Sequence, residues 1–245
     1  MSRVLAFVDE SACADDVIAT ADALARLLSA RVDVMHAAAE SPERWRGTPR
    51  ARHVAGQVGD LLAHSLDEED VLIGVLGVRS GEQTSKPMGH VVEELCVNAS
   101  KPIVVVPPGS GPPADPPIVV VPLDGTEATA RSVTPVVERL QQGGAAIVSV
   151  HVFGHDSLPP LMSSAEDRRT VAAEFDALHL HGRSDSVEMG VGDVEDMVPD
   201  LVRRVGADAV VVGWGQSLKS GRAAVIRRLI ESDVRIVLVP RAPEP

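Results

Sequence analysis

The sequence has no tyrosine, and aromatic residues make up only 2% of its 245 positions. Large aromatic side chains therefore cannot fill its core. The hydrophobic fraction of 44% must come mainly from Val, Leu, Ile and Ala. Such a composition is typical of parallel strands that are buried on both faces of a sheet.

Positive charge is also scarce. The chain has 23 Lys and Arg residues against 35 Asp and Glu residues, for a net charge of −12. A surface that binds nucleic acid or an anionic membrane needs a positive footprint. We therefore expect neither a nucleic-acid partner nor a membrane partner.

Cysteine and long apolar runs are equally rare. Cys13 and Cys96 are the only two cysteines, and their separation matches no metal-ligand spacing. We expect both to be reduced, buried thiols, and we predict no bound metal. No apolar run approaches the roughly 20 residues of a membrane span, and the first residues resemble a strand rather than a signal peptide. These features predict a cytoplasmic protein.

Proline and glycine concentrate in one segment, PPGSGPPADPP, from Pro107 to Pro117. Such a segment cannot continue a helix or a central strand, so it predicts a stiff linker. We place the linker at 109–116, between a first domain at 1–108 and a second at 117–245.

These two parts repeat each other. Three pairs of apolar segments align: RVLAFVDES with IVVVPLDGT, VLIGVLG with AVVVG, and KPIVVVP with VRIVLVP, at offsets of 115, 136 and 133. The offset grows by about 21 residues inside the copies, which is the length of one strand–helix unit. The first copy should therefore lack one such unit that the second retains.

Short, continuous apolar strands alternate with helical patterns in both copies. The second copy predicts strands at 118–122, 145–151, 187–191, 209–213 and 235–239, with helices near 127–142, 164–179, 194–205 and 222–232. The first predicts strands at 3–8, 31–36, 71–76 and 102–106, with helices near 12–29, 49–65 and 89–99. The fold class is α/β, with two tandem doubly wound parallel-sheet domains, each having its own sheet.

Ligands of such sheets bind outside the carboxyl ends of the strands, where the strand order reverses. Asp9 or Asp124 ends the first strand of each copy, and Gly77 or Gly213 begins a Gly-rich turn. A carboxylate can accept hydrogen bonds from sugar hydroxyls, and a turn before a helix can bind anions. Alternatively, the Asp residues cap helices and the Gly residues serve a sharp turn.

The motifs resemble those of the universal stress protein family over nearly the whole chain. LDGT and VDES resemble its Asp-Gly-Ser/Thr turn, and the segments after Gly77 and Gly213 resemble its loop Gly-x2-Gly-x9-Gly-Ser/Thr. In ATP-binding members that Asp holds the ribose and that loop holds the phosphates. The resemblance implies a tandem member of the adenine-nucleotide hydrolase-like fold, with ATP or another adenine nucleotide as ligand.

Both loops depart from the family pattern. Ser80 and Gln216 occupy the second Gly position, and His90 and Ala223 stand where a hydroxyl residue is expected. Side chains such as Lys219 could supply anion contacts instead. The candidate ligand-binding residues are Asp124, Gly125, Thr126, Gly213, Gly215, Gly221 and Arg222 in the second copy, and Asp9, Gly77, Arg79, Gly89 and His90 in the first.

The sequence contains no Gly-x4-Gly-Lys-Ser/Thr phosphate loop, no Gly-x-Gly-x2-Gly after a strand, no His-Glu-x2-His metalloprotease motif and no Gly-x-Ser-x-Gly nucleophile elbow. Asp176, His179 and His181 do not have the spacing of a metal site and are interpreted as surface residues. We expect a non-catalytic stress-response or signalling protein. Its two copies should pack as an internal pseudo-dimer through their final strands or helices, and two chains should form a homodimer. The alternatives are an interaction module with vestigial pockets and a slow ATP hydrolase.

Overall fold

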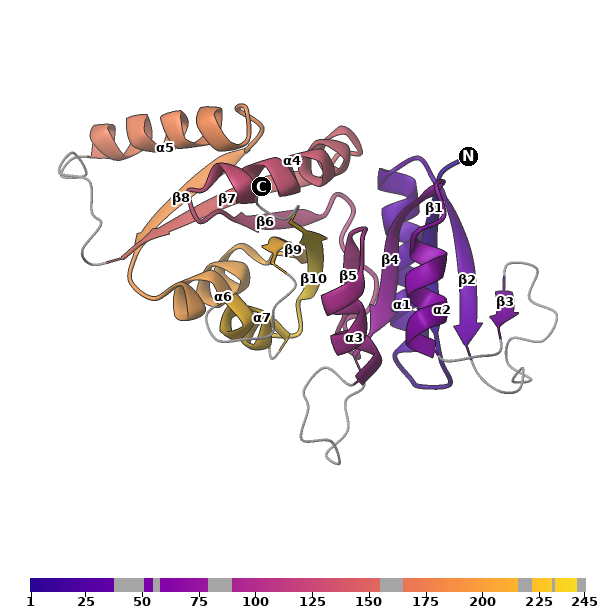
Figure 1. Cartoon of the computed structure of the whole chain (residues 1–245). Helices are drawn as coiled ribbons and strands as arrows, with labels where there is room; N and C mark the ends of the chain where they lie inside the picture. Colours follow the sequence, from indigo (N-terminus) through magenta and orange to yellow (C-terminus); the bar gives the residue numbers. More distant parts are fainter. Residues whose placement is uncertain are drawn as a thin grey trace.

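The computed structural model places ten strands in a single sheet, in the order β3-β2-β1-β4-β5-β10-β9-β6-β7-β8 (Figure 1). It describes residues 1–37, 51–54, 58–78, 90–154, 165–215, 222–230 and 232–241. The first half comprises β1 (Arg3–Val8), α1 (Ala14–Leu27), β2 (Arg31–Ala37), β3 (Ala51–Val54), α2 (Val58–Leu66), β4 (Val71–Gly77), α3 (His90–Asn98) and β5 (Ile103–Val106). The second comprises β6 (Ile118–Pro122), α4 (Glu127–Gln142), β7 (Ala146–Phe153), α5 (Ala165–His179), β8 (Ser186–Val191), α6 (Val194–Val205), β9 (Ala209–Trp214), α7 (Arg222–Ile230) and β10 (Arg235–Pro240).

The two halves have the same topology. Counted within each half, the strand order is 3-2-1-4-5, and every pair of neighbouring strands inside a half is parallel. This agreement confirms the α/β fold class and the duplication predicted from the sequence.

The halves meet through an antiparallel pair of strands. β10 pairs with β5 in the register Ile236 with Val105, Val237 with Val104 and Leu238 with Ile103. The expectation of a separate sheet for each copy was therefore wrong. Without this pairing, the final strand of each half would have an edge of backbone N–H and C=O groups that lack partners. Each of the two edges supplies hydrogen-bond partners for the other.

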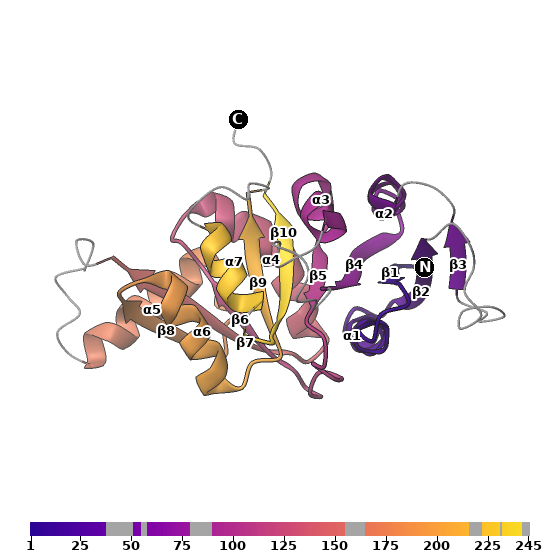
Figure 2. The ribbon, with the colours of Figure 1, turned by 90° about the horizontal axis from the view of Figure 1, so that it is seen from below.

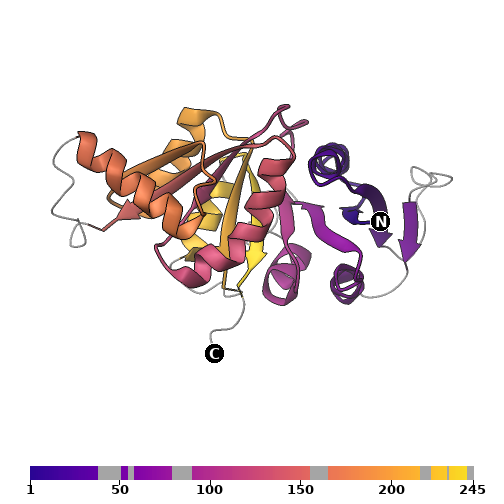
Figure 3. The same ribbon diagram turned by 90° about the horizontal axis from the view of Figure 1, so that it is seen from above.

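Helices cover both faces of the sheet, as a doubly wound fold requires. One apolar cluster packs the sheet against α2, α3, α6 and α7, and a second packs its other face against α1, α4 and α5. Views from below and from above show α2 and α3 across the first-half strands from α1 (Figure 2, Figure 3). Alternate residues of one strand serve the two clusters: Leu5 and Phe7 face one, and Val4 and Ala6 the other.

The shortening of the first copy lies in one connection. Residues 38–50 link β2 to β3, whereas the longer segment 154–185 links β7 to β8 and contains α5. The third strand itself is present as β3, inside the range 49–65 where we expected a helix. Its four residues, ARHV, are too short and too polar to predict a strand.

Two carboxylates hold the linker between the halves. Asp16 lies on α1 in the first half, and Asp208 lies just before β9 in the second. Asp16 accepts hydrogen bonds from the linker N–H groups of Gly109 (2.7 Å) and Gly111 (3.0 Å). Asp208 accepts from the linker N–H of Ala114 (2.7 Å) and from the N–H of Ile118 (2.9 Å), the first residue of β6.

The first helices of the two halves also touch. Gly143, just after α4, lies so close to Leu27 at the end of α1 that a Cβ atom on Gly143 would overlap the Leu27 carbonyl oxygen. This contact adds a second junction between the halves, on the face that α1 and α4 cover. None of the helices in the described ranges is both long and apolar enough to cross a membrane.

Candidate functional site

Asp124 follows β6 and forms a tight turn into α4. Its Oδ1 accepts hydrogen bonds from the backbone N–H of Thr126 (3.0 Å) and from the Thr126 hydroxyl (2.7 Å). Gly125 between them has a φ of 78°, which favours glycine. The Thr126 hydroxyl in turn accepts from the N–H of Thr129 (3.3 Å), so Thr126, rather than Asp124, is the N-cap of α4.

This turn favours the ionised form of Asp124. Partial burial acts to raise the pKa of Asp124, but hydrogen bonds from Thr126 and Thr129 and the charge of Arg241 outweigh it. The pKa of Asp124 is therefore lower than usual. At neutral pH the side chain is a carboxylate, which can only accept hydrogen bonds.

The sheet opens beside Asp124. β6 and β9 pair through Val119 with Ala209 and Val120 with Val210, and the described register ends there. The corresponding strands of the first half, β1 and β4, remain paired as far as Phe7 and Leu76. The strand order reverses between β6 and β9. The predicted location for a ligand therefore coincides with a local separation of strands in the second half.

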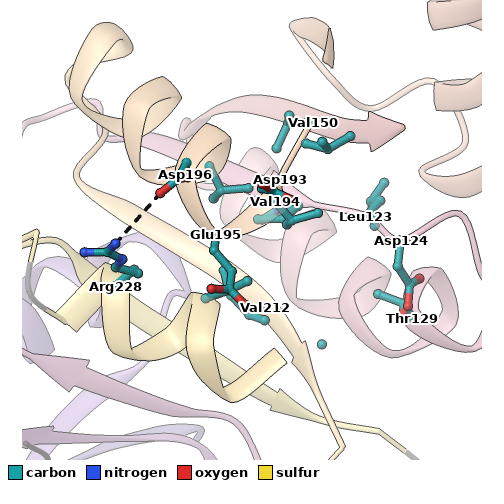
Figure 4. Close-up of a pocket in the computed structure, with 15 residues that line it drawn as sticks. Leu123, Asp124, Thr129, Val150, Asp193, Val194, Glu195, Asp196, Val212 and Arg228 are labelled. Atoms are coloured by element: carbon teal, nitrogen blue, oxygen red, sulfur yellow. Dashed lines mark ion pairs between the residues drawn. The ribbon is translucent and has the colours of Figure 1, made fainter. Parts of the chain in front are cut away.

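A cavity of about 670 Å³ occupies this location. The ends of β6, β7 and β9 form its floor, and α6 and α7 form its walls (Figure 4). Its apolar lining consists chiefly of aliphatic side chains, namely Leu123, Val150, Val152, Val198, Val212 and Val225. This size and lining suit a small organic molecule that has a flat apolar part.

The polar lining of the cavity is mostly acidic. Asp124 contributes one carboxylate from the turn after β6, and the start of α6 contributes three, from Asp193, Glu195 and Asp196. Arg228 on α7 is the cation among the described lining residues, and its Nη2 lies 3.9 Å from Asp196 Oδ1 (Figure 4). Acidic residues in a first turn complement the helix dipole, so part of this charge also stabilises α6.

Gly213 has a packing role that explains its presence. A Cβ atom there would lie 3.0 Å from Thr129 Cγ2 and 3.1 Å from Ser132 Oγ, both on α4. Gly77 is equivalent in the first half, where a Cβ would lie 2.6 Å from Cys13 Sγ. Close helix–strand packing thus accounts for the repetition of this glycine in both halves, and no phosphate contact is needed to explain it.

On the other face of β7, a stack of rings lies near Asp124. His151 Nδ1 lies 2.8 Å from the carbonyl oxygen of Leu123, next to Asp124. The His151 ring packs against Phe153 and Phe175, with centroids 4.4 Å and 4.7 Å away, and Phe175 packs against His179 at 4.3 Å. Burial and His151 lower the pKa of His179, against the opposing effect of Asp124.

The interpretation of Asp176 and His179 as surface residues was wrong, because both side chains are buried. Asp176 accepts hydrogen bonds from the N–H (3.3 Å) and hydroxyl of Ser184 and so fixes the turn after α5. Sequence spacing could not reveal that these side chains are buried. The partner of Asp176, Ser184, lies in the following turn, and His151, which influences His179, lies on β7. His181 is exposed, as expected. In the described part of the chain, no group of His, Cys, Asp and Glu side chains could hold a metal ion.

In the first half, Asp9 makes the same local turn as Asp124, since its Oδ1 accepts from the N–H of Ser11 at 2.9 Å. The Cys13 thiol is buried and donates to the carbonyl oxygen of Val106 at 3.5 Å. Burial is the main cause that raises the pKa of Cys13 to about 11, so the thiol stays protonated. The expectation of a buried thiol is thus met at Cys13.

The structure brings together part of the predicted set. Asp124 and Gly213 line the cavity, Gly125 and Thr126 lie in the adjoining turn, and Gly215 follows β9. Arg222 and His90 begin α7 and α3, but their side chains are not described. Arg79, Gly89 and Gly221 lie outside the described residues, as does Lys219.

Several lining residues were missed by sequence reasoning: Asp193, Glu195, Asp196, Val198, Val225 and Arg228. Asp193 and the acids after it have the sequence of an ordinary helix start, which gives no sign of a cavity. The helical periodicity places Val198 on the apolar face of α6, but it cannot show that a cavity remains between this face and the sheet.

Comparisons with known proteins agree with this fold. The model of the universal stress protein family matches residues 117–235. A universal stress protein from Archaeoglobus fulgidus DSM 4304 superposes with a TM-score of 0.65 at 14% identity, covering 99% of this chain and 97% of that one. A protein of unknown function from Pseudomonas aeruginosa PAO1 gives 0.66 at 11% identity, with 98% and 93% covered. No curated protein matches the sequence significantly.

The solved structures cover both halves, so the likeness extends to the whole two-half fold. At these identities it concerns the fold alone. The family match, in contrast, is a match of sequence, and it covers the half that contains the cavity and the LDGT turn. Residues 117–235 thus match the universal stress protein family in sequence, and the whole chain is similar to universal stress proteins in fold.

Proposed function

We propose that the second half binds an adenine nucleotide or nucleoside in the cavity beside Asp124, and that the chain acts as a non-catalytic stress-response or signalling protein. The observation that carries this proposal is the position of the cavity. It lies at the carboxyl ends of β6, β7 and β9, where the strand order reverses, in the half that matches the family.

The lining supports a base and a sugar. Val150, Val152, Val198 and Val212 offer aliphatic surface against which a planar base can pack. Asp124 is an ionised acceptor at the edge of this surface, which suits the hydroxyl groups of a ribose. The cavity volume of about 670 Å³ lies within the usual range for small-molecule sites.

For a phosphate group, we propose the segment from Gly215 to Arg222. This segment leads from the end of β9 to the first residue of α7. A helix N-terminus attracts anions through its free N–H groups. In this proposal Gly221, Lys219 and Arg222 supply the contacts in the second copy, and Arg79, Gly89 and His90 correspond to them in the first.

Titration calorimetry of the full chain with ATP, ADP and AMP tests the proposal, together with native mass spectrometry of the purified protein for a retained nucleotide. We expect binding of at least one of the three. Asp124→Asn should weaken it by about tenfold, because a charge-assisted hydrogen bond is lost. Asp200→Asn is the matched control, since Asp200 is exposed on α6 and pairs with Arg203. Absence of binding by the wild-type chain would refute the proposal.

The partner proposal follows from the β5–β10 pair. We propose that the chain is its own pseudo-dimer, in which each half completes the sheet of the other. A homodimer of whole chains would then have to use other surfaces. Sedimentation equilibrium tests this, and Val104→Pro in β5 should disturb folding of the chain rather than dissociate two chains.

A further inference from the structure

We infer that Glu195 selects against polyphosphates in the cavity, so that its preferred ligand is an adenine nucleoside or monophosphate rather than a triphosphate. This inference rests on the proposed function and concerns the charge of the ligand. Its starting point is the position of the Glu195 carboxylate within the cavity.

Glu195 is the second residue of α6 and an exposed lining residue of the cavity. In Figure 4 its side chain extends beside Val212, between α6 and α7, whereas Asp124 and Thr129 lie at the other end of the cavity. Val212 lies two residues before the end of β9 at Trp214, where the segment toward α7 begins. Glu195 therefore lies on the side where the phosphates of a bound nucleotide would extend.

The other charges around the cavity add to the repulsion that a phosphate group would meet near Glu195. Four carboxylates line the cavity, and Asp196 is paired with the lining cation Arg228. Beyond the lining, Arg241 lies near enough to influence Asp124. Lys219 and Arg222 are the remaining cations that the adjoining segment can provide.

If all four of these cations faced the ligand, they would only balance the four carboxylates. A site for a triphosphate normally has an excess of positive charge or helix N–H donors aimed at the phosphates. Each added phosphate brings at least about one more negative charge into a site whose described lining has no positive excess. A nucleoside adds none, and a monophosphate can be held by the start of α7 alone.

The test compares the affinities of adenosine, AMP and ATP for the full chain by titration calorimetry in magnesium-free buffer, at low salt and at 0.5 M salt. We expect the wild-type chain to bind adenosine or AMP more tightly than ATP. Added salt should reduce the disadvantage of ATP, because salt screens repulsion between like charges.

Glu195→Gln removes the charge while keeping the shape of the side chain. It should tighten ATP binding about threefold to tenfold at low salt, which is the scale of one charge–charge interaction in a solvated site. The affinity for adenosine should change by less than about twofold, because adenosine carries no charge. Glu174→Gln is the matched control, because Glu174 is exposed on α5 and is not part of the cavity lining. Thermal unfolding of both variants checks that α6 remains folded.

Two results would overturn the inference while leaving the proposed function intact. One is wild-type binding of ATP at least as tight as that of adenosine and AMP. The other is an equal response of ATP binding to Glu195→Gln and Glu174→Gln. If none of the three ligands binds the wild-type chain or either variant, the proposed function fails and the inference fails with it.

Discussion

Arg235, the first residue of β10, donates a hydrogen bond from Nε to the hydroxyl of Thr20 on α1, 2.9 Å away. Both side chains are buried, and they belong to different halves of the chain. The same guanidinium donates to the linker carbonyl groups of Ser110 (3.2 Å) and Gly111. One side chain therefore ties together the first half, the linker and the second half.

Replacing Arg235 with Met should lower the free energy of unfolding by about 2 to 4 kcal/mol. Met keeps most of the volume, but the buried Thr20 hydroxyl and the partly buried linker carbonyl groups lose their donor, which costs more than the average net value of a hydrogen bond. Urea denaturation measures the change. Arg203→Met is the control, since Arg203 forms an exposed pair on α6 and should change stability by less than about 1 kcal/mol. Equal losses in the two variants would mean that Arg235 does not connect the halves.

The junction between α1 and α4 should be intolerant of a single methyl group. In Gly143→Ala, the new Cβ would lie 2.7 Å from Leu27 Cα and would overlap the Leu27 carbonyl oxygen. Because this obstacle is backbone, the helices must move apart, and we expect a loss of about 1 to 3 kcal/mol. Gly215→Ala is the control for denaturation, since no atom of the described residues lies within 4 Å of its Cβ position. A Gly143→Ala protein as stable as Gly215→Ala would contradict the close contact.

Gly77 and Cys13 should show strong energetic coupling. Gly77→Ala places a methyl group 2.6 Å from Cys13 Sγ and should be destabilising. Removing that sulfur in the double variant Gly77→Ala/Cys13→Ala should recover part of the loss, because the nearest obstacle is then the Cβ atom at 3.1 Å. A double-mutant cycle measured by denaturation should give an interaction energy of about 1 kcal/mol. Simple additivity would show that the two residues do not compete for space.

Stability should depend on pH through His179. Burial and His151 lower its pKa in the folded protein below the ordinary value of 6.5, so the folded state binds this proton less readily than the unfolded chain. The contribution of His179 is therefore complete above pH 6.5 and is lost as the pH falls toward the folded pKa.

His179→Gln removes this titration. Its free energy of unfolding should fall less steeply between pH 7 and pH 5 than that of the wild-type chain, whatever its absolute stability. His64→Gln is the control, because His64 is exposed near the end of α2. Parallel pH profiles for the wild type and His179→Gln would exclude a role for His179.

Most of the sheet could be predicted because its strands are short, Val-rich runs bounded by Gly, Pro or Asp. Segments such as Ile118–Pro122 have no competing helical pattern. β3 escaped prediction because four residues with two basic side chains carry no alternation that can be recognised. The pairing of β5 with β10 also escaped, since an apolar strand shows that it is buried but not which strand lies beside it.

The candidate site was only partly predictable. Asp124 and Gly213 could be located because both copies of the repeat contain them. Their individual roles depend on distances that no spacing reveals: Gly213 packs closely against Thr129, and Asp124 forms a turn with Thr126. Glu195 could not be recognised, since an acid in the first turn of a helix is ordinary and only its position over β9 distinguishes it.

The bond between Arg235 and Thr20 occurs on one side of the junction only. By the repeat offsets, Pro102 occupies the place of Arg235 in the first copy, and Pro135 occupies the place of Thr20 in the second. Neither proline can reproduce the contact. Two identical subunits would have to make such a bond twice or not at all, whereas a fused chain can keep a single one. Covalent fusion thus frees the two copies from the requirement to match, and the connection between their second and third strands differs in length accordingly.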